Sequence, residues 1–271
     1  MTLVYAYGIL RATDARPDVR TAVAAIAGIA GAPLRLVIDG PCAAAVSDVP
    51  ERDFAEEPLN EHLGDLDWLG PRAVLHQEAN AGLGRLVSSL VPLSFGTVFR
   101  DDAGVTRLLA TERDTFVARL DMLAGREEWI ATLRRDDVIA TAGLEAGSAV
   151  LGTLRAEIAS APPGRAYLLG RRLGETIAGE LRRQDAEADA RVTEILTASG
   201  ARLFREPLAT NAGTGPGSAV GRYSALVTSA GAGSLASAAA LFAAEWGPRG
   251  YVLELSGPWP AYRFATLAAA S

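Results

Sequence analysis

The sequence predicts an α+β protein built from two domains. The chain has 271 residues, of which 49% are hydrophobic, and this is enough for one large or two modest cores. Short apolar runs typical of strands alternate with Ala- and Leu-rich helical segments along its whole length. Gly125 separates a long helical pattern from a new strand pattern. We therefore expect an N-terminal α+β domain over residues 1–124 and a C-terminal domain over residues 125–271.

The N-terminal domain opens with strand, helix and hairpin patterns. Residues 3–10 alternate small or aromatic with apolar side chains and predict a buried strand, and the Ala-rich residues 19–29 predict a helix. Two further apolar runs, 34–38 and 42–47, flank Asp39-Gly40-Pro41. Asp-Gly between apolar runs predicts a hairpin, and the proline after it favours a loop of more than two residues.

Helical patterns dominate the rest of this domain. Asp101 and Asp102 predict the N-terminal cap of a helix over residues 103–123, whose apolar positions follow helical spacing. The segments between the hairpin and this cap are an irregular acidic stretch (50–58), two helices (59–69 and 73–83) and a strand (86–95). The N-terminal domain therefore resembles a modified ferredoxin-like arrangement with extra helices.

The C-terminal domain shows the order β-α-β-β-α-β, which is ferredoxin-like. Its elements are a strand (127–133), a poorly patterned connection (136–152), a helix (163–199), a strand (201–205), a Gly-rich loop (211–217), a strand (223–228), a helix (234–246) and a strand (251–255). From about residue 257, Pro258 and Pro260 bracket Trp259 and predict a stiff, extended tail that cannot continue a central strand.

Composition excludes several classes of partner. The net charge of −6 and the pI of about 5.1 provide no basic field for nucleic acid. The single cysteine, Cys42, cannot form an intramolecular disulfide. The N-terminus lacks the pattern of a signal peptide, and the apolar stretch 225–244 contains too many Ser, Thr and Gly residues for a membrane helix. We expect a cytoplasmic protein without a membrane span.

No motif predicts catalysis, a cofactor or a metal. The Gly-rich residues 211–217 lack the lysine of a phosphate-binding loop and precede a strand. The two histidines, His62 and His76, do not have a metal-ligand spacing, and Cys42 lies in a strand, where a buried thiol is inert. No serine lies in a Gly-x-Ser-x-Gly elbow. We expect that the protein is not an enzyme.

Two aromatic segments are candidate partner-binding sites. Phe95, Phe99 and Arg100 flank a turn before the capped helix, and Trp259 and Tyr262 lie in the proline-rich tail. In one interpretation they display a contact surface. In the other, the two phenylalanines fill the core and the tail docks back to clamp the two domains; for the tail we favour docking.

The order of motifs resembles the GvpL/GvpF family of gas vesicle proteins. Tyr5-Ala6-Tyr7-Gly8-Ile9 resembles the opening pattern of the family, and Val91-Pro92-Leu93-Ser94-Phe95-Gly96-Thr97-Val98-Phe99 its central segment. The end, Gly257-Pro258-Trp259-Pro260-Ala261-Tyr262-Arg263-Phe264, resembles its Gly-Pro-x-Pro-Pro-Tyr-x-Phe close. Ala261 replaces the second proline of that pattern, and Gly221-Arg222-Tyr223 departs from the usual residues of its strand.

This resemblance implies a non-enzymatic accessory role in gas vesicle assembly. The implied partners are the small hydrophobic shell protein and other gas vesicle accessory proteins, and the implied location is the cytoplasm, in association with the vesicle. Strand addition or a helix-binding groove would keep an apolar subunit from aggregating. The alternative is a small-molecule-binding or enzymatic ferredoxin-like protein with a pocket between sheet and helices.

Overall fold

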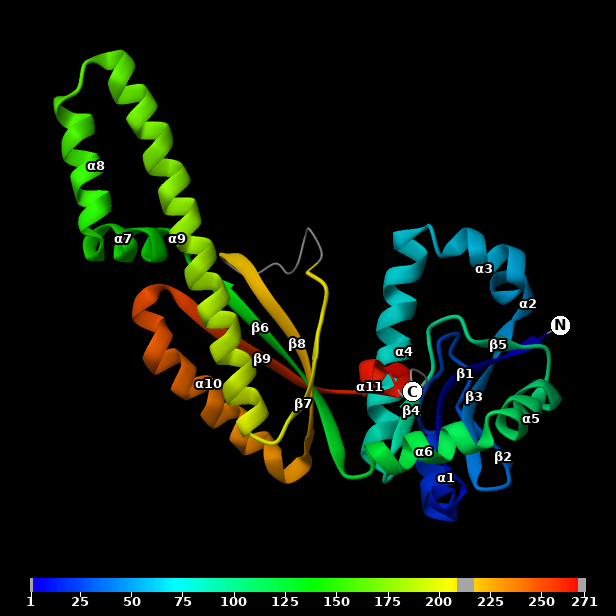
Figure 1. The fold of residues 1–271 in the computed structure, drawn as a ribbon. Helices are drawn as coiled ribbons and strands as arrows, with labels where there is room; N and C mark the ends of the chain where they lie inside the picture. Colours follow the sequence, from blue (N-terminus) through cyan, green and yellow to red (C-terminus); the bar gives the residue numbers. More distant parts are fainter. Residues whose placement is uncertain (1, 209–216, 268–271) are drawn as a thin grey trace. The chain divides into compact units, whose positions relative to one another are not determined.

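The computed structural model describes residues 2–208 and 217–267 and combines helices with two β-sheets (Figure 1). The chain forms two compact units, one of Met1–Glu128 with Pro258–Ser271 and the other of Trp129–Gly257. The tail therefore groups with the N-terminal residues, whereas the sequence-based division placed it with the C-terminal domain. The reason is local packing, because Phe264 in α11 (Tyr262–Leu267) is 1% exposed within the first unit.

The sheet of the first unit has β1 (Thr2–Arg11) at its centre. The strand order is β2-β3-β1-β4, and β5 also pairs with β1. The other strands are β2 (Arg35–Asp39), β3 (Cys42–Pro50), β4 (Leu90–Pro92) and β5 (Val98–Phe99). The register between β1 and β3 shifts between Ala6 and Gly8. Gly8 suits this irregular point because Leu90 and Asn80 come within 2.9 and 3.1 Å of where a Cβ would stand.

The hairpin of β2 and β3 confirms the Asp-Gly signal but corrects the length of its loop. Asp39 pairs with Cys42, so the loop contains only Gly40 and Pro41. Gly40 has a φ of +53°, and the proline ring holds the next φ near −65°. This combination of signs is that of a type II′ turn, in which a proline at the second position is compatible with a two-residue loop.

The helices of the first unit differ from the predictions in their boundaries. The stretch predicted as irregular forms α2 and α3, the next two predicted helices give way to one helix through Pro71, and the long predicted helix breaks at Glu112. The predicted strand 86–95 is reduced to β4. The helices are α1 (Pro17–Ala24), α2 (Glu51–Phe54), α3 (Glu56–His62), α4 (Leu66–Leu86), α5 (Asp102–Thr111) and α6 (Arg113–Leu123).

The second unit carries a sheet with the strand order β7-β8-β6-β9. Helices α9 and α10 cover one face of it (Figure 1). The core lies between the sheet and these helices and includes Val192 and Phe242, both fully buried. The strands are β6 (Arg126–Arg135), β7 (Arg202–Arg205), β8 (Ser218–Thr228) and β9 (Tyr251–Trp259), and the two helices are α9 (Pro163–Ala198) and α10 (Ala232–Trp246). β9 continues to Trp259, which an edge strand tolerates because the missing N–H of Pro258 breaks no central ladder.

The predicted connection 136–152 is helical instead. It forms α7 (Asp137–Gly147) and the start of α8 (Ala149–Ser160), and α8 packs along α9. Asp136 caps α7 by accepting from the backbone N–H groups of Val138 and Ile139, and Ser148 caps α8. Asp136 and Ser148 are therefore the sequence signal for these two helices, which the weak apolar pattern did not predict. Most of the predicted Gly-rich loop 211–217 lies outside the described residues.

No helix in the part of the chain that the structure describes combines the length and the apolarity needed to cross a membrane.

Candidate functional site around His76

Two tyrosines of β1 form the base of a buried polar cluster in the first unit. Tyr5 and Tyr7 lie two residues apart, so their side chains point to the same face of the sheet, and both are fully buried. The Tyr7 hydroxyl accepts a hydrogen bond from the backbone N–H of Ile29 at 2.7 Å and shares one with Ser47 Oγ at 2.8 Å. The buried hydroxyl of Tyr7 thus has hydrogen-bond partners from two other segments of the chain.

His76, on α4, lies against Tyr5. The Tyr5 hydroxyl is 2.9 Å from His76 Nδ1 and accepts from the backbone N–H of Gly96 at 3.1 Å. Nε2 lies 3.2 Å from the carbonyl oxygen of Leu93. Burial lowers the pKa of His76, so the ring is neutral.

Asn80, one helical turn after His76, joins the C-terminal segment to this ring. Its amide lies 3.1 Å from His76 Nε2 and 3.0 Å from the Tyr262 hydroxyl. The amide nitrogen, Nδ2, is the atom that faces both groups, and it donates to the Tyr262 hydroxyl. Burial raises the pKa of Tyr262 to about 12, so its hydroxyl stays protonated and can donate. We call Tyr5, His76, Asn80, Phe95 and Tyr262 the His76 cluster.

The His76 cluster unites three distant parts of the sequence. Phe95 and Tyr262 flank His76 with ring centroids 5.7 and 6.3 Å away. The start, middle and end of the chain, which carry the three sequence motifs, therefore meet at one histidine. Sequence reasoning missed Asn80, although its spacing of four residues from His76 on a helix is a signal that the two share a face.

The other predicted partner-binding residues lie apart from this cluster. Phe99 pairs with Val4 in the sheet, and its side chain lies 3.3 Å from where a Cβ of Gly104 on α5 would stand. Arg100 follows it and is exposed. Trp259 is 40% exposed. Their role in binding a partner stays a prediction.

The chemistry of the His76 cluster suits a structural role, in which hydrogen bonds hold segments of the chain together. Among the described residues, no group of three or more His, Cys, Asp or Glu side chains is placed to hold a metal ion. The His76 ring has both nitrogens engaged by neutral partners. Such an arrangement positions segments, and it holds the C-terminal residues against α4.

We expect the stability of the first unit to fall on acidification because of His76. The pKa of His76 is lowered in the folded state, whereas the unfolded chain takes up a proton below about pH 6.5. Above that pH the effect is absent; below it, the free energy of unfolding decreases by up to about 1.4 kcal/mol per pH unit.

Urea unfolding at pH 7.5 and 5.5 measures this effect. A His76→Gln variant should lack the histidine-dependent component, and a His62→Gln variant should retain it. A wild-type protein that gains stability relative to His76→Gln on acidification would contradict the neutral assignment.

Comparison with known proteins agrees with the motifs that meet at His76. Residues 3–266 match the family model described as gas vesicle synthesis protein GvpL/GvpF. The chain is 35% identical over 242 residues to gas vesicle protein L of Streptomyces sp. (strain CB03234), covering 89% of this chain and 86% of that protein. It is 27% identical to gas vesicle protein F of the same strain, over 96% and 98% of the two chains.

Solved structures share the fold. The crystal structure of GvpF from Anabaena sp. PCC7120 matches with a TM-score of 0.74 at 14% identity, over 98% of this chain and 99% of that one. GvpF from Microcystis aeruginosa matches with a TM-score of 0.65, also at 14% identity, over 97% and 99%. The likeness therefore extends over both compact units, and the family model spans the motifs from β1 to α11. The chain belongs to the GvpL/GvpF family of gas vesicle proteins.

Proposed function

We propose that this chain is a non-enzymatic accessory protein of gas vesicle formation that binds the hydrophobic shell protein and assists its assembly. Membership of the GvpL/GvpF family points to a role in gas vesicle formation. Its place of action is the cytoplasm, in association with the vesicle and its other accessory proteins. A subunit that polymerises through apolar surface must be protected from aggregation before it joins the shell, and a binding protein can do this.

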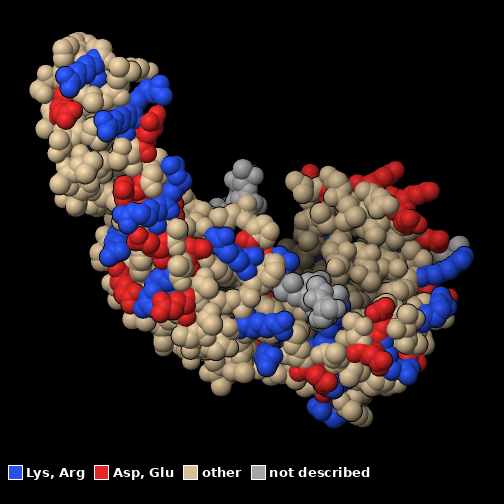
Figure 2. All heavy atoms as spheres, in the orientation of Figure 1, with Lys and Arg blue, Asp and Glu red and all other residues tan. Residues whose placement is uncertain are grey.

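The observation that carries the proposal is apolar surface on α7, α8 and the first half of α9. Large apolar side chains are exposed there, and Figure 2 shows few charged atoms over α8. Their exposed fractions are Val138 79%, Ile139 48%, Val150 63%, Tyr167 70% and Leu168 63%. Exposed apolar side chains that recur on neighbouring helices are typical of an interaction surface.

The contact surface also includes the Phe95–Arg100 turn and the Trp259–Tyr262 segment. Arg100 and Trp259 are exposed and would contact the partner directly. Phe95 and Tyr262 are half-buried against His76 and would hold these segments in place. Phe99 anchors the turn to β1.

We further propose that the two units are domains, both related to the ferredoxin-like fold. The strand orders are β2-β3-β1-β4 and β7-β8-β6-β9. When β6 to β9 are counted as the first to fourth strands of the second unit, both sheets have the order second, third, first, fourth. In the second unit the element order β6-α9-β7-β8-α10-β9 supports the same description, with α7 and α8 as additions. In the first unit, α2 and α3 precede the second crossover helix, α4.

Co-expression with the shell protein and affinity capture of this chain tests the function. We expect the shell protein to be retained at moderate salt. The pair Tyr167→Ser and Leu168→Ser, and separately the pair Arg100→Ala and Trp259→Ala, should each reduce the captured amount at least about fivefold, because each fivefold step corresponds to only about 1 kcal/mol of binding free energy.

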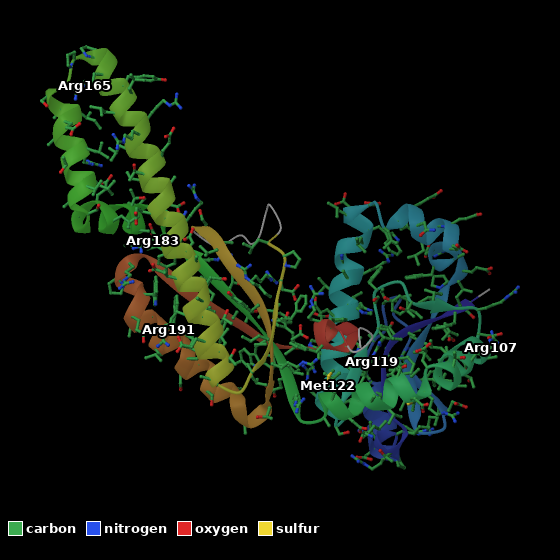
Figure 3. The ribbon with its side chains drawn as sticks, viewed as in Figure 1. Arg107, Arg119, Met122, Arg165, Arg183 and Arg191 are labelled. Atoms are coloured by element: carbon green, nitrogen blue, oxygen red, sulfur yellow. The ribbon has the colours of Figure 1, made fainter. Side chains whose placement is uncertain are left out.

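The control is Arg183→Ala in the second half of α9, an arginine with a 62% exposed side chain that belongs to neither surface (Figure 3). It should leave capture unchanged. Absence of the shell protein from a folded wild-type sample would overturn the proposed partner. Unchanged capture by either double variant would overturn the corresponding surface.

A further inference from the structure

A cavity in the first unit has the properties of a binding site. It has a volume of about 380 Å³ and lies between α4, the segment before β4 and residues 258–261. All of its lining residues belong to the first unit. The volume is within the range of pockets that hold small molecules or peptide side chains. Neither the sequence motifs nor the family comparison assigns it a role.

Two lining residues carry buried polar atoms that lack a hydrogen-bond partner among the described residues. They are Ser89 Oγ and Asn80 Oδ1, and the two residues are 6% and 0% exposed. Leaving such a group unsatisfied costs about 1–3 kcal/mol. The Asn80 oxygen is an acceptor, and the Ser89 hydroxyl can donate. A ligand that carries both a hydrogen-bond donor and an acceptor, as a peptide does, would satisfy both atoms.

The charged and apolar residues that line the cavity indicate which chemical groups the ligand carries. Arg85 and Arg126 both line it, and Glu127 offsets one of their two positive charges. The guanidinium of Arg126 also donates to the carbonyl of Met122 at 3.0 Å. The rest of the wall is largely apolar and includes the ring of Trp259 between two prolines. A carboxylate suits the Ser89 hydroxyl and the arginines, and an apolar neighbour suits the indole wall.

We propose that this cavity binds a peptide segment of a partner protein that presents a carboxylate beside an apolar side chain. A peptide residue pair such as Leu-Glu supplies both groups at once, and the volume accommodates their side chains. That the peptide belongs to a gas vesicle protein rests on the proposed function, whereas the chemistry of the cavity does not.

The test uses the full chain and two synthetic peptides. The probe is acetyl-Ala-Ala-Leu-Glu-Ala-Ala-amide, and its matched control carries Gln in place of Glu. Binding is followed by NMR through the indole N–H signal of Trp259, which is identified by its loss in the Trp259→Phe variant. We expect the Glu peptide to shift this signal and to bind at least about tenfold more tightly than the Gln peptide, since a charged acceptor is lost.

Variants separate binding from folding. Ser89→Ala removes a buried hydroxyl without a described partner, so it should leave the unfolding free energy unchanged or higher while weakening the Glu peptide several-fold. Arg85→Ala should weaken the same peptide about tenfold, and Arg107→Ala, which removes another exposed arginine of the same unit, should not.

Each outcome decides the proposal. Equal affinity for the Glu and Gln peptides, or no shift of the Trp259 signal, would overturn it. Binding of hexanoate as tight as that of the Glu peptide would overturn the peptide as occupant and assign the cavity to free carboxylates. If the peptide fails while the shell protein is still captured by the wild-type chain, the cavity proposal falls and the proposed function stands.

Discussion

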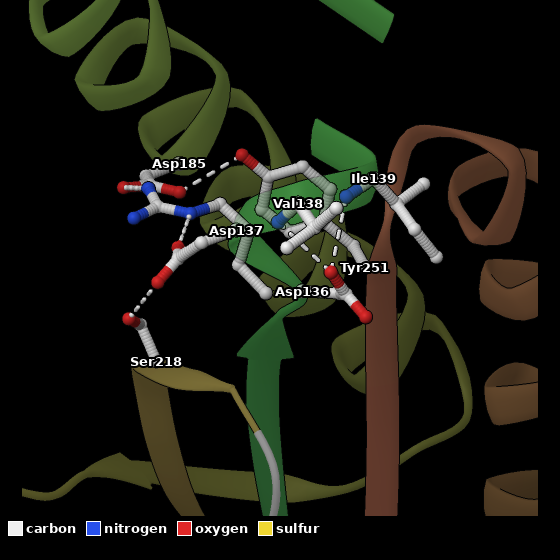
Figure 4. A network of polar contacts seen from close by, with 8 residues as sticks. Asp136, Asp137, Val138, Ile139, Asp185, Ser218 and Tyr251 are labelled. Carbon is white, nitrogen blue, oxygen red and sulfur yellow. Dashed lines mark hydrogen bonds and ion pairs between the residues drawn. The ribbon is translucent and has the colours of Figure 1, made fainter. Parts of the chain in front are cut away.

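Replacing Asp185 by alanine is expected to lower the free energy of unfolding of the second unit by about 3 kcal/mol. The carboxylate of Asp185, on α9, accepts from the Tyr251 hydroxyl at 2.8 Å (Figure 4). It also pairs with Arg135. Tyr251 is fully buried and the side chain of Arg135 is only 14% exposed. Alanine would leave a buried hydroxyl without its partner and a largely buried guanidinium with one carboxylate fewer.

The same arrangement, an α9 carboxylate that accepts from a tyrosine hydroxyl and pairs with an arginine, recurs one turn later on α9. Asp189 accepts from the hydroxyl of Tyr223 and pairs with Arg205 at 3.0 Å. Tyr251 and Tyr223 come from β9 and β8, so two carboxylates four residues apart attach α9 to two strands. Since the first half of α9 packs along α8, these two turns hold the helix to the sheet.

Urea unfolding of the Asp185→Ala variant measures this loss. The control is Asp137→Ala, because Asp137 also pairs with Arg135 but its side chain is 54% exposed, so it should cost below about 1 kcal/mol. In a Tyr251→Phe background, Asp185→Ala should cost at least about 1 kcal/mol less, because the hydroxyl is already absent. Equal costs in both backgrounds would show that the tyrosine does not contribute to the attachment.

The sequence predicted the elements whose signals are local and periodic. β1 shows alternation, α9 begins at Pro163 after a second proline, and α10 follows a small-residue turn. These patterns depend on neighbours a few residues apart, and the structure confirms them. The helix predicted for residues 163–199 ends at Ala198 in the structure.

Elements whose boundaries depend on tertiary contacts were predicted less well. Residues 137–160 are helical although their apolar residues do not form a clear stripe, because α8 packs on another helix, α9, and exposes much of its remaining surface. The predicted strand 86–95 is shortened to Leu90–Pro92. Before it, α4 runs to Leu86 and the backbone N–H of Ser88 bonds to Asp14; after it, the backbone at Leu93 and Gly96 bonds to His76 and Tyr5.

The candidate site was predictable only in part. The sequence singled out Phe95 and Tyr262, and both lie on His76. It could not indicate that Asn80 bonds to Tyr262, because 182 positions separate them and no local pattern reports such a contact. Nor could it indicate that the Ser89 hydroxyl lacks a hydrogen-bond partner among the described residues, because this depends on the tertiary surroundings of the hydroxyl.

Replacing Gly28 by alanine is expected to lower the free energy of unfolding of the first unit by about 3 kcal/mol. A Cβ at this position would lie 2.5 Å from Ser47 Oγ, 2.7 Å from the Tyr7 hydroxyl and 2.8 Å from the carbonyl oxygen of Ala32. All three distances are far below van der Waals contact. The methyl group must therefore separate Ser47 from Tyr7, whose hydroxyl also accepts from the backbone N–H of Ile29.

The matched control makes the same chemical change where space is open. Gly84 lies in α4, and outside its own helix and chain neighbours no atom lies within 4 Å of where its Cβ would stand. Gly84→Ala should therefore stabilise the unit by up to about 1 kcal/mol through helix propensity. Urea unfolding of both variants, followed by tryptophan fluorescence, should give shifts of opposite sign. Removing the nearest obstacle with Ser47→Ala should restore part of the loss in Gly28→Ala. A cost below about 1 kcal/mol for Gly28→Ala would mean that the loop before Ile29 can move away, and that the buried Tyr7 hydroxyl is not what holds it against the sheet.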